Sequence, residues 1–459
     1  MHEFGDHYEE EYLYLADLTD TAALISWGKF FFASTMELVR DRKLHLLDGQ
    51  HGRHTSIGAN CEPYGPVDVE VLNAAGTIVQ SIRVVNDTFA WVSGLTPDTD
   101  YTYRVIAEPE TTRRVWAAGQ LWSYSPRIKE LVETDRTYAC RFRTFPPLDS
   151  SAPLTFAVIG DTGTGDDEQA RLARALEAAV DRMGARFVLM TGDTVYRGSG
   201  GAGDDDDEWL MTYFQPYRTL IDRIPFYPCV GNHDTAETLG EGGQGDTLML
   251  YDNLLVTPRF SERRPGRHAE ITKGLFYRFR YGADVECICL DTSKEKLLFG
   301  KRMFQKDPGR TWMRQAFAQP LGSPRWRIAF SHHPPYAAGP LHGDTNSMRD
   351  DIVPLCIDNG VRAFFSGHEH NFQCLDSEDP GRRVRCFVTG GGGTWREGEP
   401  NNATNGFLHA WGGNAGTHFL MVTIDGSTMR VEPTTVDGDP LPLVSRRGQS
   451  VESPIVVTL

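Results

Sequence analysis

The sequence predicts an α/β protein built from two parts: an all-β sandwich over residues 1–146, followed by an α/β sandwich over residues 154–459. Short apolar stretches that alternate with polar residues fill the first part, as expected for half-buried strands. In the second part, apolar strand-like runs are interleaved with a helical pattern. Between them, residues 145–153 read Phe-Pro-Pro-Leu-Asp-Ser-Ser-Ala-Pro, which disfavours both helix and strand pairing. We therefore expect a linker between two domains.

The clearest strands of the first part form a predicted hairpin. Val67, Val69 and Val71 alternate with polar neighbours, which is the period of a strand with one buried face. Residues 73–76, Asn-Ala-Ala-Gly, break this pattern, and residues 77–79 resume it as the hairpin partner.

A second segment of the first part indicates which kind of sandwich it is. Residues 94–105 read Gly-Leu-Thr-Pro-Asp-Thr-Asp-Tyr-Thr-Tyr-Arg-Val and resemble the turn of fibronectin type III domains, where Leu, Pro and Tyr form a tyrosine corner. Trp27, in a strand-like run, fits the core tryptophan of that fold. An insertion near 107–139 departs from the minimal pattern. We expect no chemistry in this domain.

The second part opens with a strand, a helix and a strand. Residues 154–159 and 187–190 are apolar, and each run leads into Gly-Asp. The residues between them have helical periodicity, with Asp166 and Asp167 near the start and Gly184 at the end. This arrangement predicts a pair of parallel strands. Further strands are predicted at 226–230, 327–330, 363–365 and 386–388, with a closing hairpin over 419–436.

Composition excludes several classes of function. The formal net charge of −16 argues against non-specific nucleic-acid binding, which depends on a basic surface. No apolar run approaches the ~20 residues that a membrane helix needs. The N-terminal residues lack the basic-then-apolar order of a signal peptide, so we expect a cytoplasmic protein. The eight cysteines demand no disulfide framework in a chain of this length, and we expect reduced thiols.

Five short segments share one pattern, in which an apolar strand is followed by a loop of Gly or Ser with Asp, Asn or His. Hard metal ions prefer carboxylate oxygen and neutral imidazole ligands, and glycines let the backbone turn so that ligands from separate strands converge. Two metal ions that act together need a shared ligand, for which a carboxylate is suited. The segments therefore predict a dinuclear metal site. They are Gly160-Asp161-Thr162-Gly163, Gly192-Asp193-Thr194-Val195-Tyr196, Gly231-Asn232-His233-Asp234, Ser331-His332-His333-Pro334 and Gly367-His368-Glu369-His370.

These segments resemble the calcineurin-like metallophosphoesterases and, within them, the purple acid phosphatases, over the span 154–436. The distinguishing detail is Tyr196, three residues after Asp193, because the purple branch has a tyrosine there that binds ferric iron. The resemblance implies a ferric ion and a divalent ion of Fe, Zn or Mn, bridged by Asp193. The implied ligands are Asp161, Asp193, Tyr196 and His370 for the ferric ion, and Asp193, Asn232, His332 and His368 for the divalent ion.

The resemblance also implies roles for residues that do not bind metal. His233 would face the substrate phosphate, as a hydrogen-bond donor or as the acid for the leaving group, and Asp234 would orient its ring. His342 lies in a loop where relatives carry a substrate-facing histidine, although a surface histidine is an equal reading. His333 occupies a variable position, and we expect a partly buried neighbour of the site rather than a ligand.

The leading functional hypothesis is a phosphomonoesterase of the purple acid type, in which a metal-bound hydroxide attacks the phosphorus of a small phosphorylated substrate. A phosphodiesterase or nucleotide hydrolase on the same site is the alternative, with Tyr196 incidental. A third hypothesis is a binding or adhesion protein whose phosphoesterase domain is inert. Loops at 197–225, 235–275 and 394–417 would decide between monoester and diester, and the sequence leaves the oligomeric state open.

Overall fold

The structure is a computed structural model, which describes most of the residues of the chain. These are 2–4, 7–33, 36–38, 44–46, 66–85, 87–107, 115–116, 140–196, 209–234, 254, 259, 269–272, 275–292, 308–339, 341–377, 383–400 and 406–459. Most of the predicted insertion at 107–139, and most of the loop 235–275, lie outside the described residues.

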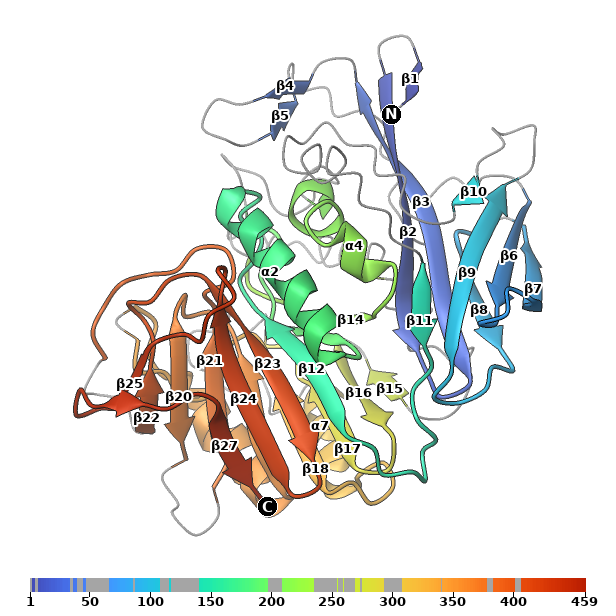
Figure 1. The fold of residues 1–459 in the computed structure, drawn as a ribbon. Helices are drawn as coiled ribbons and strands as arrows, with labels where there is room; N and C mark the ends of the chain where they lie inside the picture. Colours follow the sequence, from blue (N-terminus) through green and yellow to red (C-terminus); the bar gives the residue numbers. More distant parts are fainter. Residues whose placement is uncertain are drawn as a thin grey trace.

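The described residues of the first part form two larger antiparallel sheets and one separate pair of strands (Figure 1). One has the order β1 (His2–Phe4), β2 (His7–Leu18), β3 (Ala22–Ala33), β8 (Phe89–Ser93). The other has the order β10 (Val115–Trp116), β9 (Asp100–Ala107), β6 (Val67–Leu72), β7 (Ile78–Val84), with β11 (Arg141–Arg143) also paired to β9. A separate pair joins β4 (Met36–Leu38) and β5 (Leu44–Leu46). The prediction of an all-β first part is confirmed.

The hairpin, the tyrosine corner and the core tryptophan predicted for the first part are all present in the structure. Val67, Val69 and Val71 are all fully buried in β6, which pairs with β7 as the predicted hairpin. The hydroxyl oxygen of Tyr101 accepts a hydrogen bond from the Thr96 amide at 2.9 Å, which is the contact of a tyrosine corner. The side chain of Trp27 is fully buried in the core between the strands.

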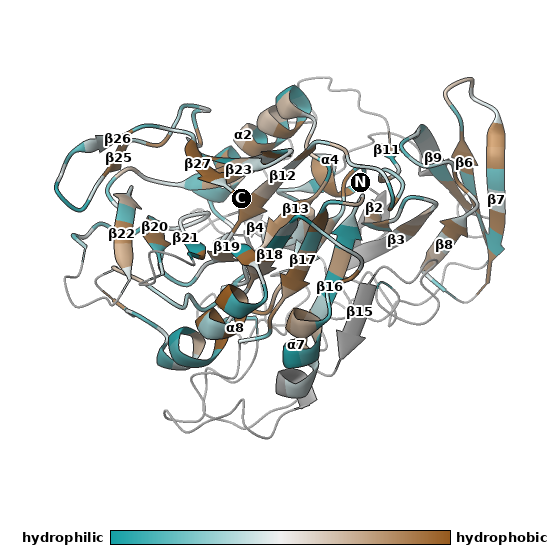
Figure 2. Ribbon diagram, turned by 90° about the horizontal axis from the view of Figure 1, so that it is seen from below, coloured by the Kyte–Doolittle hydropathy of each residue, from teal (hydrophilic) through white to brown (hydrophobic). Residues whose placement is uncertain are grey.

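The second part contains two sheets packed face to face, with helices on their outer sides (Figures 1 and 2). The first sheet has the order β14 (Phe226–Pro228), β13 (Val188–Met190), β12 (Leu154–Ile159), β23 (His418–Asp425), β24 (Thr428–Thr435), β27 (Ile455–Thr458). The second has the order β15 (Ala269–Thr272), β16 (Phe276–Tyr281), β17 (Val285–Cys289), β18 (Trp326–Phe330), β19 (Val361–Ser366), β21 (Arg385–Thr389), β20 (Phe372–Asp376), β22 (Phe407–Trp411), β25 (Leu443–Val444), β26 (Ser450–Val451). The predicted α/β sandwich is thereby confirmed.

Aromatic side chains fill the space between these sheets. The ring of Phe156 lies 5.1 Å from that of Phe187 and 6.1 Å from that of Phe365, which belongs to the opposite sheet. Phe187 also contacts Phe279 edge-on at 5.4 Å. Edge-to-face pairs at these distances are favourable beyond the area that they bury. The apolar interior therefore holds the two sheets, and the strand ends between them, in fixed positions.

Helices cover the outer faces. Helices α2 (Asp167–Met183) and α4 (Arg218–Ile221) lie on the side of the six-stranded sheet, and α7 (Pro308–Ala318) and α8 (Val353–Asp358) on that of the ten-stranded sheet (Figure 2). Two π-helical turns, Leu210–Phe214 and Met348–Ile352, precede α4 and α8. None of the helices in the described part is long and apolar enough to cross a membrane.

Helix α2 begins and ends as its sequence predicts. The Asp166 carboxylate accepts a hydrogen bond from the Gln169 amide at 3.0 Å and caps the first turn. Gly184, with φ of 67°, adopts the left-handed conformation that ends the helix. The flanking strands β12 and β13 are parallel, as expected for this strand–helix–strand unit.

The two parts contact each other through buried groups. The ring of Phe145 lies 5.0 Å from that of Tyr281. The Tyr227 hydroxyl donates a hydrogen bond to Asp17 Oδ1 at 2.6 Å, and the Tyr103 hydroxyl donates to the Asp222 carbonyl oxygen at 2.5 Å. Because Tyr227 belongs to β14, the first part supports a strand that leads directly into one of the predicted metal-binding loops.

Candidate metal centre

The five predicted segments meet at one place, where strands of the two sheets end. Strands β12, β13 and β14 are neighbours in the six-stranded sheet and lead to Asp161, Asp193 and Asn232. Strands β18 and β19 are parallel neighbours in the ten-stranded sheet and lead to His332 and His368. The packing of the two sheets thus brings side chains together from positions that are more than two hundred residues apart.

The backbone at this place is unusual. Asp161, Asp193 and His368 have φ of 57°, 52° and 71°, and only one other non-glycine residue in the described part, Asp98, has a positive φ. Side chains other than glycine disfavour this conformation, and it persists where the surroundings enforce it, often at functional sites. Three of the seven predicted ligands therefore stand on strained backbone.

Glycines in the loops allow the close approach of these ligands. A Cβ atom on Gly231 would lie 2.1 Å from Asp193 Oδ1, and one on Gly367 would lie 2.2 Å from Asp161 Oδ2. Either contact is too short to be tolerated, so any larger residue would displace a carboxylate.

One group of predicted ligands surrounds the phenol of Tyr196. Its hydroxyl donates a hydrogen bond to Asp161 Oδ1 at 3.1 Å and lies 3.0 Å from His370 Nε2. The same imidazole nitrogen lies 3.4 Å from Asp161 Oδ1. We call Asp161, Tyr196 and His370 the tyrosine half of the site.

A second group surrounds the imidazole of His332. His332 Nε2 lies 2.9 Å from Asn232 Oδ1 and 3.2 Å from His368 Nδ1. Its other ring nitrogen, Nδ1, donates to the Thr191 carbonyl oxygen at 2.8 Å, which leaves the lone pair of Nε2 facing the cluster. We call Asn232, His332 and His368 the imidazole half.

Asp193 lies between the halves. Its Oδ2 is 3.4 Å from His332 Nε2, and Asp161, Asp193 and His332 offer ligand atoms within 4.8 Å of one another. Its Oδ1 accepts a hydrogen bond from the His233 amide at 2.8 Å. This is the position that a bridging carboxylate would occupy.

The electrostatics of the cluster suit bound cations. Burial raises the pKa of the Asp161 and Asp193 carboxyls to about 7, and the neighbouring charge of Asp161 adds to the rise at Asp193. Burial lowers the pKa of His370 to about 4, which keeps its imidazole neutral and able to bind a metal. A bound metal ion would offset the cost of ionising these buried carboxyls, because its positive charge compensates theirs. The residues present therefore fit two cations.

Asp234 fastens two of the loops together. Its carboxylate oxygens accept hydrogen bonds from the backbone amides of Asp193 at 2.9 Å, Thr194 at 2.8 Å, Val195 at 3.2 Å and Gly231 at 2.8 Å. Burial raises the pKa of this carboxyl, too, to about 7. The side chain thus holds the loop of the bridging residue against the loop of Asn232. Its predicted role in orienting the His233 ring stays a prediction.

The two candidate catalytic histidines lie beside different halves. The half-buried ring of His233 lies 4.8 Å from the ring of Tyr196. The exposed ring of His342 lies 4.1 Å from the ring of His368 at an angle of 34°. Both predicted residues are therefore brought to the site, one at each half.

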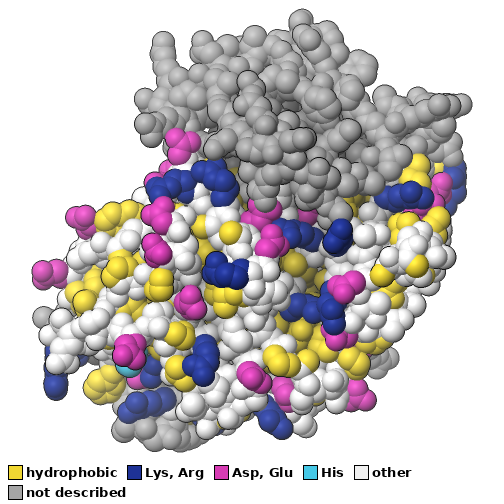
Figure 3. Space-filling model, in the orientation of Figure 1, with side chains coloured by type: hydrophobic (Ala, Val, Ile, Leu, Met, Phe, Trp, Pro, Cys, Tyr) yellow, Lys and Arg dark blue, Asp and Glu magenta, His cyan; other side chains and the backbone are white. Residues whose placement is uncertain are grey.

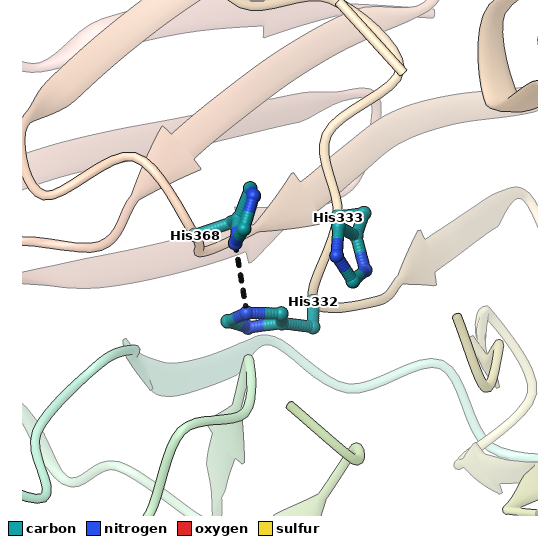
Figure 4. A group of neighbouring side chains, drawn as sticks. All are labelled: His332, His333 and His368. Carbon is teal, nitrogen blue, oxygen red and sulfur yellow. Dashed lines mark hydrogen bonds between the residues drawn. The ribbon is translucent and has the colours of Figure 1, made fainter. Parts of the chain in front are cut away.

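His333 differs from its prediction in one respect. It is fully buried rather than partly buried, and its Nδ1 lies 3.1 Å from the Thr292 hydroxyl. Figure 4 shows its ring beside those of His332 and His368, with which it offers nitrogens within 4.8 Å of one another. The apolar strand before it carries both adjacent histidines into the interior.

Sequence reasoning missed two supporting groups. The Thr191 carbonyl, which orients His332, is a backbone atom and leaves no trace in the sequence. Glu369, which stands between two predicted ligands, accepts hydrogen bonds from the His342 and Gly343 amides at 2.7 and 3.2 Å. Its place in the Gly-His-Glu-His segment was a signal that could have been followed.

Comparisons with known proteins agree with this geometry. Residues 154–372 match the family model described as calcineurin-like phosphoesterase. The chain is similar to purple acid phosphatase 17 of Arabidopsis thaliana, at 25% identity over 55% of this chain and 73% of the relative. It is also similar to tartrate-resistant acid phosphatase type 5 of Oryctolagus cuniculus, at 24% identity over 49% of this chain and 70% of the relative.

Solved structures show the same fold at low identity. A purple acid phosphatase from seeds of yellow lupin (Lupinus luteus) aligns over 98% of this chain and 74% of its own, with a TM-score of 0.61 and 14% identity. A structure described as PhoD aligns over 97% of this chain and 92% of its own, with a TM-score of 0.57 and 12% identity. The alignment in both cases includes the first, all-β part of the chain.

Proposed function

We propose that this chain, a metal-dependent hydrolase of the calcineurin-like phosphoesterase family, cleaves phosphomonoesters in the manner of a purple acid phosphatase. The observation that carries the proposal is the Tyr196 hydroxyl, which lies within 3.1 Å of both Asp161 and His370. A phenol packed among carboxylates and imidazoles is a fitting ligand for ferric iron. Burial and the charge of Asp161 raise the pKa of this phenol well above its usual value, so a strong Lewis acid is needed to ionise it.

The two halves would hold different ions. The tyrosine half, with Asp193, would hold ferric iron, and the imidazole half, with Asp193, would hold a divalent ion of Fe, Zn or Mn. When bound, the two ions neutralise charge on the phosphate and activate a water molecule for attack on phosphorus.

The chain's own groups would then bind the substrate and move protons. The His233 backbone is fixed by its hydrogen bond to Asp193, so its side chain is held beside Tyr196, where it can donate to a phosphate oxygen or to the leaving group. His342 lies at the imidazole half, where its ring is 4.1 Å from the ring of His368. We propose that these two histidines stabilise the charge that develops on the phosphate and on the departing oxygen.

The proposed substrate is a small phosphorylated molecule rather than a nucleic acid. The formal net charge is −16, and Figure 3 shows acidic and basic side chains interspersed over the described part of one face. Strong nucleic-acid binding depends on a concentration of positive charge.

The test is hydrolysis by the purified, metal-loaded full chain of nitrophenyl phosphate and of bis(nitrophenyl) phosphate. We expect a higher kcat/KM for the monoester and loss of both activities after chelation. A higher kcat/KM for the diester would support the phosphodiesterase alternative. A chain that binds both metal ions but hydrolyses neither ester would support the binding-protein alternative.

A further inference from the structure

Glu369 is a buried carboxylate between the predicted metal ligands His368 and His370, but it forms hydrogen bonds with a different loop. Its Oε1 accepts hydrogen bonds from two successive backbone amides, those of His342 at 2.7 Å and Gly343 at 3.2 Å. These amides belong to the loop 337–344, which carries the candidate catalytic residue His342 and follows the predicted ligand segment of β18. The carboxylate therefore joins the ligand loop after β19 to the loop that carries His342.

The loop is closely fitted around this carboxylate. A Cβ atom on Gly339 would lie 2.4 Å from Glu369 Oε2, so the chain passes directly over the side chain. The Ala338 amide donates to Gln373 Oε1 at 2.6 Å, and the Ala337 amide donates to Asp344 Oδ1 at 2.9 Å. Side-chain acceptors thus hold the backbone of this loop at residues 337, 338, 342 and 343.

These hydrogen bonds determine where the imidazole ring of His342 lies. With its amide fixed by Glu369, His342 places its imidazole against that of His368, 4.1 Å away, while remaining exposed to solvent. His368 is a predicted ligand of the divalent ion. The ring of His342 is therefore held between the imidazole half and solvent.

We propose that Glu369 is a positioning residue, whose carboxylate fixes the His342 loop and so aims the His342 ring at the leaving group. The inference rests on the proposed phosphoesterase function and adds a residue to it. Two backbone N–H groups that share one charged acceptor are held more firmly than they would be by neutral acceptors. Removing the carboxylate leaves both amides without this partner and releases the loop.

The experiment is a double-mutant cycle with Glu369→Ala, His342→Ala and the double variant, assayed on an alkyl phosphate and on nitrophenyl phosphate. Loss of a proton donor lowers the rate by ~10²-fold or more, chiefly for the alkyl ester, whose leaving group needs the proton. We expect His342→Ala to show this loss and Glu369→Ala to show a loss of the same kind. The double variant should be no slower than His342→Ala, because Glu369 acts through His342.

Two further variants serve as controls. Glu369→Gln keeps an oxygen acceptor and should retain most of the activity lost in Glu369→Ala. Glu452→Gln removes an exposed carboxylate from the segment after β26 and should leave the rates on both substrates unaffected, which controls for the change in net charge. Each variant should keep the metal content of the parent protein.

Several outcomes would overturn the inference. Losses that multiply in the double variant would show that Glu369 acts independently of His342. Loss of bound metal in Glu369→Ala would show that the carboxylate supports the ligands rather than the loop. Full activity of His342→Ala would show that His342 has no catalytic role that Glu369 could support. None of these results bears on whether the parent protein is a phosphomonoesterase, which is tested separately by its hydrolysis of the monoester and the diester.

Discussion

The two halves of the candidate centre are built from different chemistry. The tyrosine half offers a phenol, a carboxylate and an imidazole, whereas the imidazole half offers two imidazoles and an amide oxygen. Charged oxygen ligands suit a harder, more highly charged ion, and neutral nitrogen ligands suit a divalent ion. This difference supports the proposal that the site holds two unlike metal ions, with Asp193 as their shared ligand.

The halves also differ in how they are supported. The imidazole half is oriented from outside, since the Thr191 carbonyl fixes the tautomer of His332. In the tyrosine half the ligands contact one another directly, through the Tyr196 hydroxyl. The His368 amide connects the halves, because it donates to both oxygens of Asp161 at 3.0 and 2.9 Å.

The largest effect is expected from the residue that both halves share. Asp193→Ala should abolish turnover and lower the metal content below two ions per chain, because it removes the bridging carboxylate. Metal analysis and a phosphatase assay on the same preparation test this. Near-normal activity with full metal content would rule out a dinuclear site bridged by Asp193.

Removal of His332 should disable one half only. His332→Ala takes away the imidazole that contacts both Asn232 and Asp193, so the divalent ion should be lost together with most of the turnover. Iron and its colour should remain. Equal loss of both ions, measured by elemental analysis, would show that the halves are not separate sites.

His233→Asn should keep both ions and lose about 10²–10⁴-fold in turnover, as expected when a proton donor or phosphate-binding group is removed. The loss should be smaller for nitrophenyl esters than for an alkyl phosphate, because only the alkoxide needs a proton to leave. Equal losses for both esters would assign His233 to phosphate binding. No loss for either ester would show that His233 has neither role and would favour His342 alone as the proton donor.

Tyr196→Phe tests the other half through colour rather than rate. A phenolate bound to ferric iron absorbs visible light by charge transfer, so the variant should bleach or shift strongly while keeping Asp161 and His370. An iron-loaded variant with an unchanged visible spectrum would show that Tyr196 is not a ligand and would favour the phosphodiesterase alternative.

The smallest expected effect concerns pH. In the metal-free protein the pKa of Asp161, Asp193 and Asp234 is raised to about 7, so these carboxyls hold protons that the unfolded chain releases near pH ~4. Between pH ~4 and about pH 7, the free energy of unfolding of the metal-free protein falls as pH rises, because the native state binds more protons than the unfolded state. Metal ions displace those protons, so the gain in Tm on adding metal should grow from pH 5 to pH 8. A gain in Tm that is constant from pH 5 to pH 8 would contradict the displacement of protons from these carboxyls by metal ions.

Much of this molecule could be predicted from local patterns. The α2 helix is marked by its own caps, Asp166 and Gly184, and the ligand loops are marked by glycines next to acidic residues or histidine. These signals are local because a turn, a cap or a left-handed residue is decided within a few positions of the chain.

Other features depend on partners far away in the sequence. Strand β22 (Phe407–Trp411) was not predicted, because it is stabilised by pairing with β20 rather than by its own pattern. The bond from Tyr227 to Asp17 joins residues 210 positions apart and ties the first part to the second. For the same reason the direction of the Glu369 carboxylate could not be foreseen, since it is set by the loop 337–344.

The central claim, that two unlike metal ions share Asp193, is tested most directly by elemental analysis and a visible absorption spectrum of the purified full chain, recorded beside its phosphatase activity. We predict two metal ions per chain, one of them iron, with a charge-transfer band in the visible range. Full activity in a colourless protein that holds two identical divalent ions, or only one ion per chain, would contradict the account.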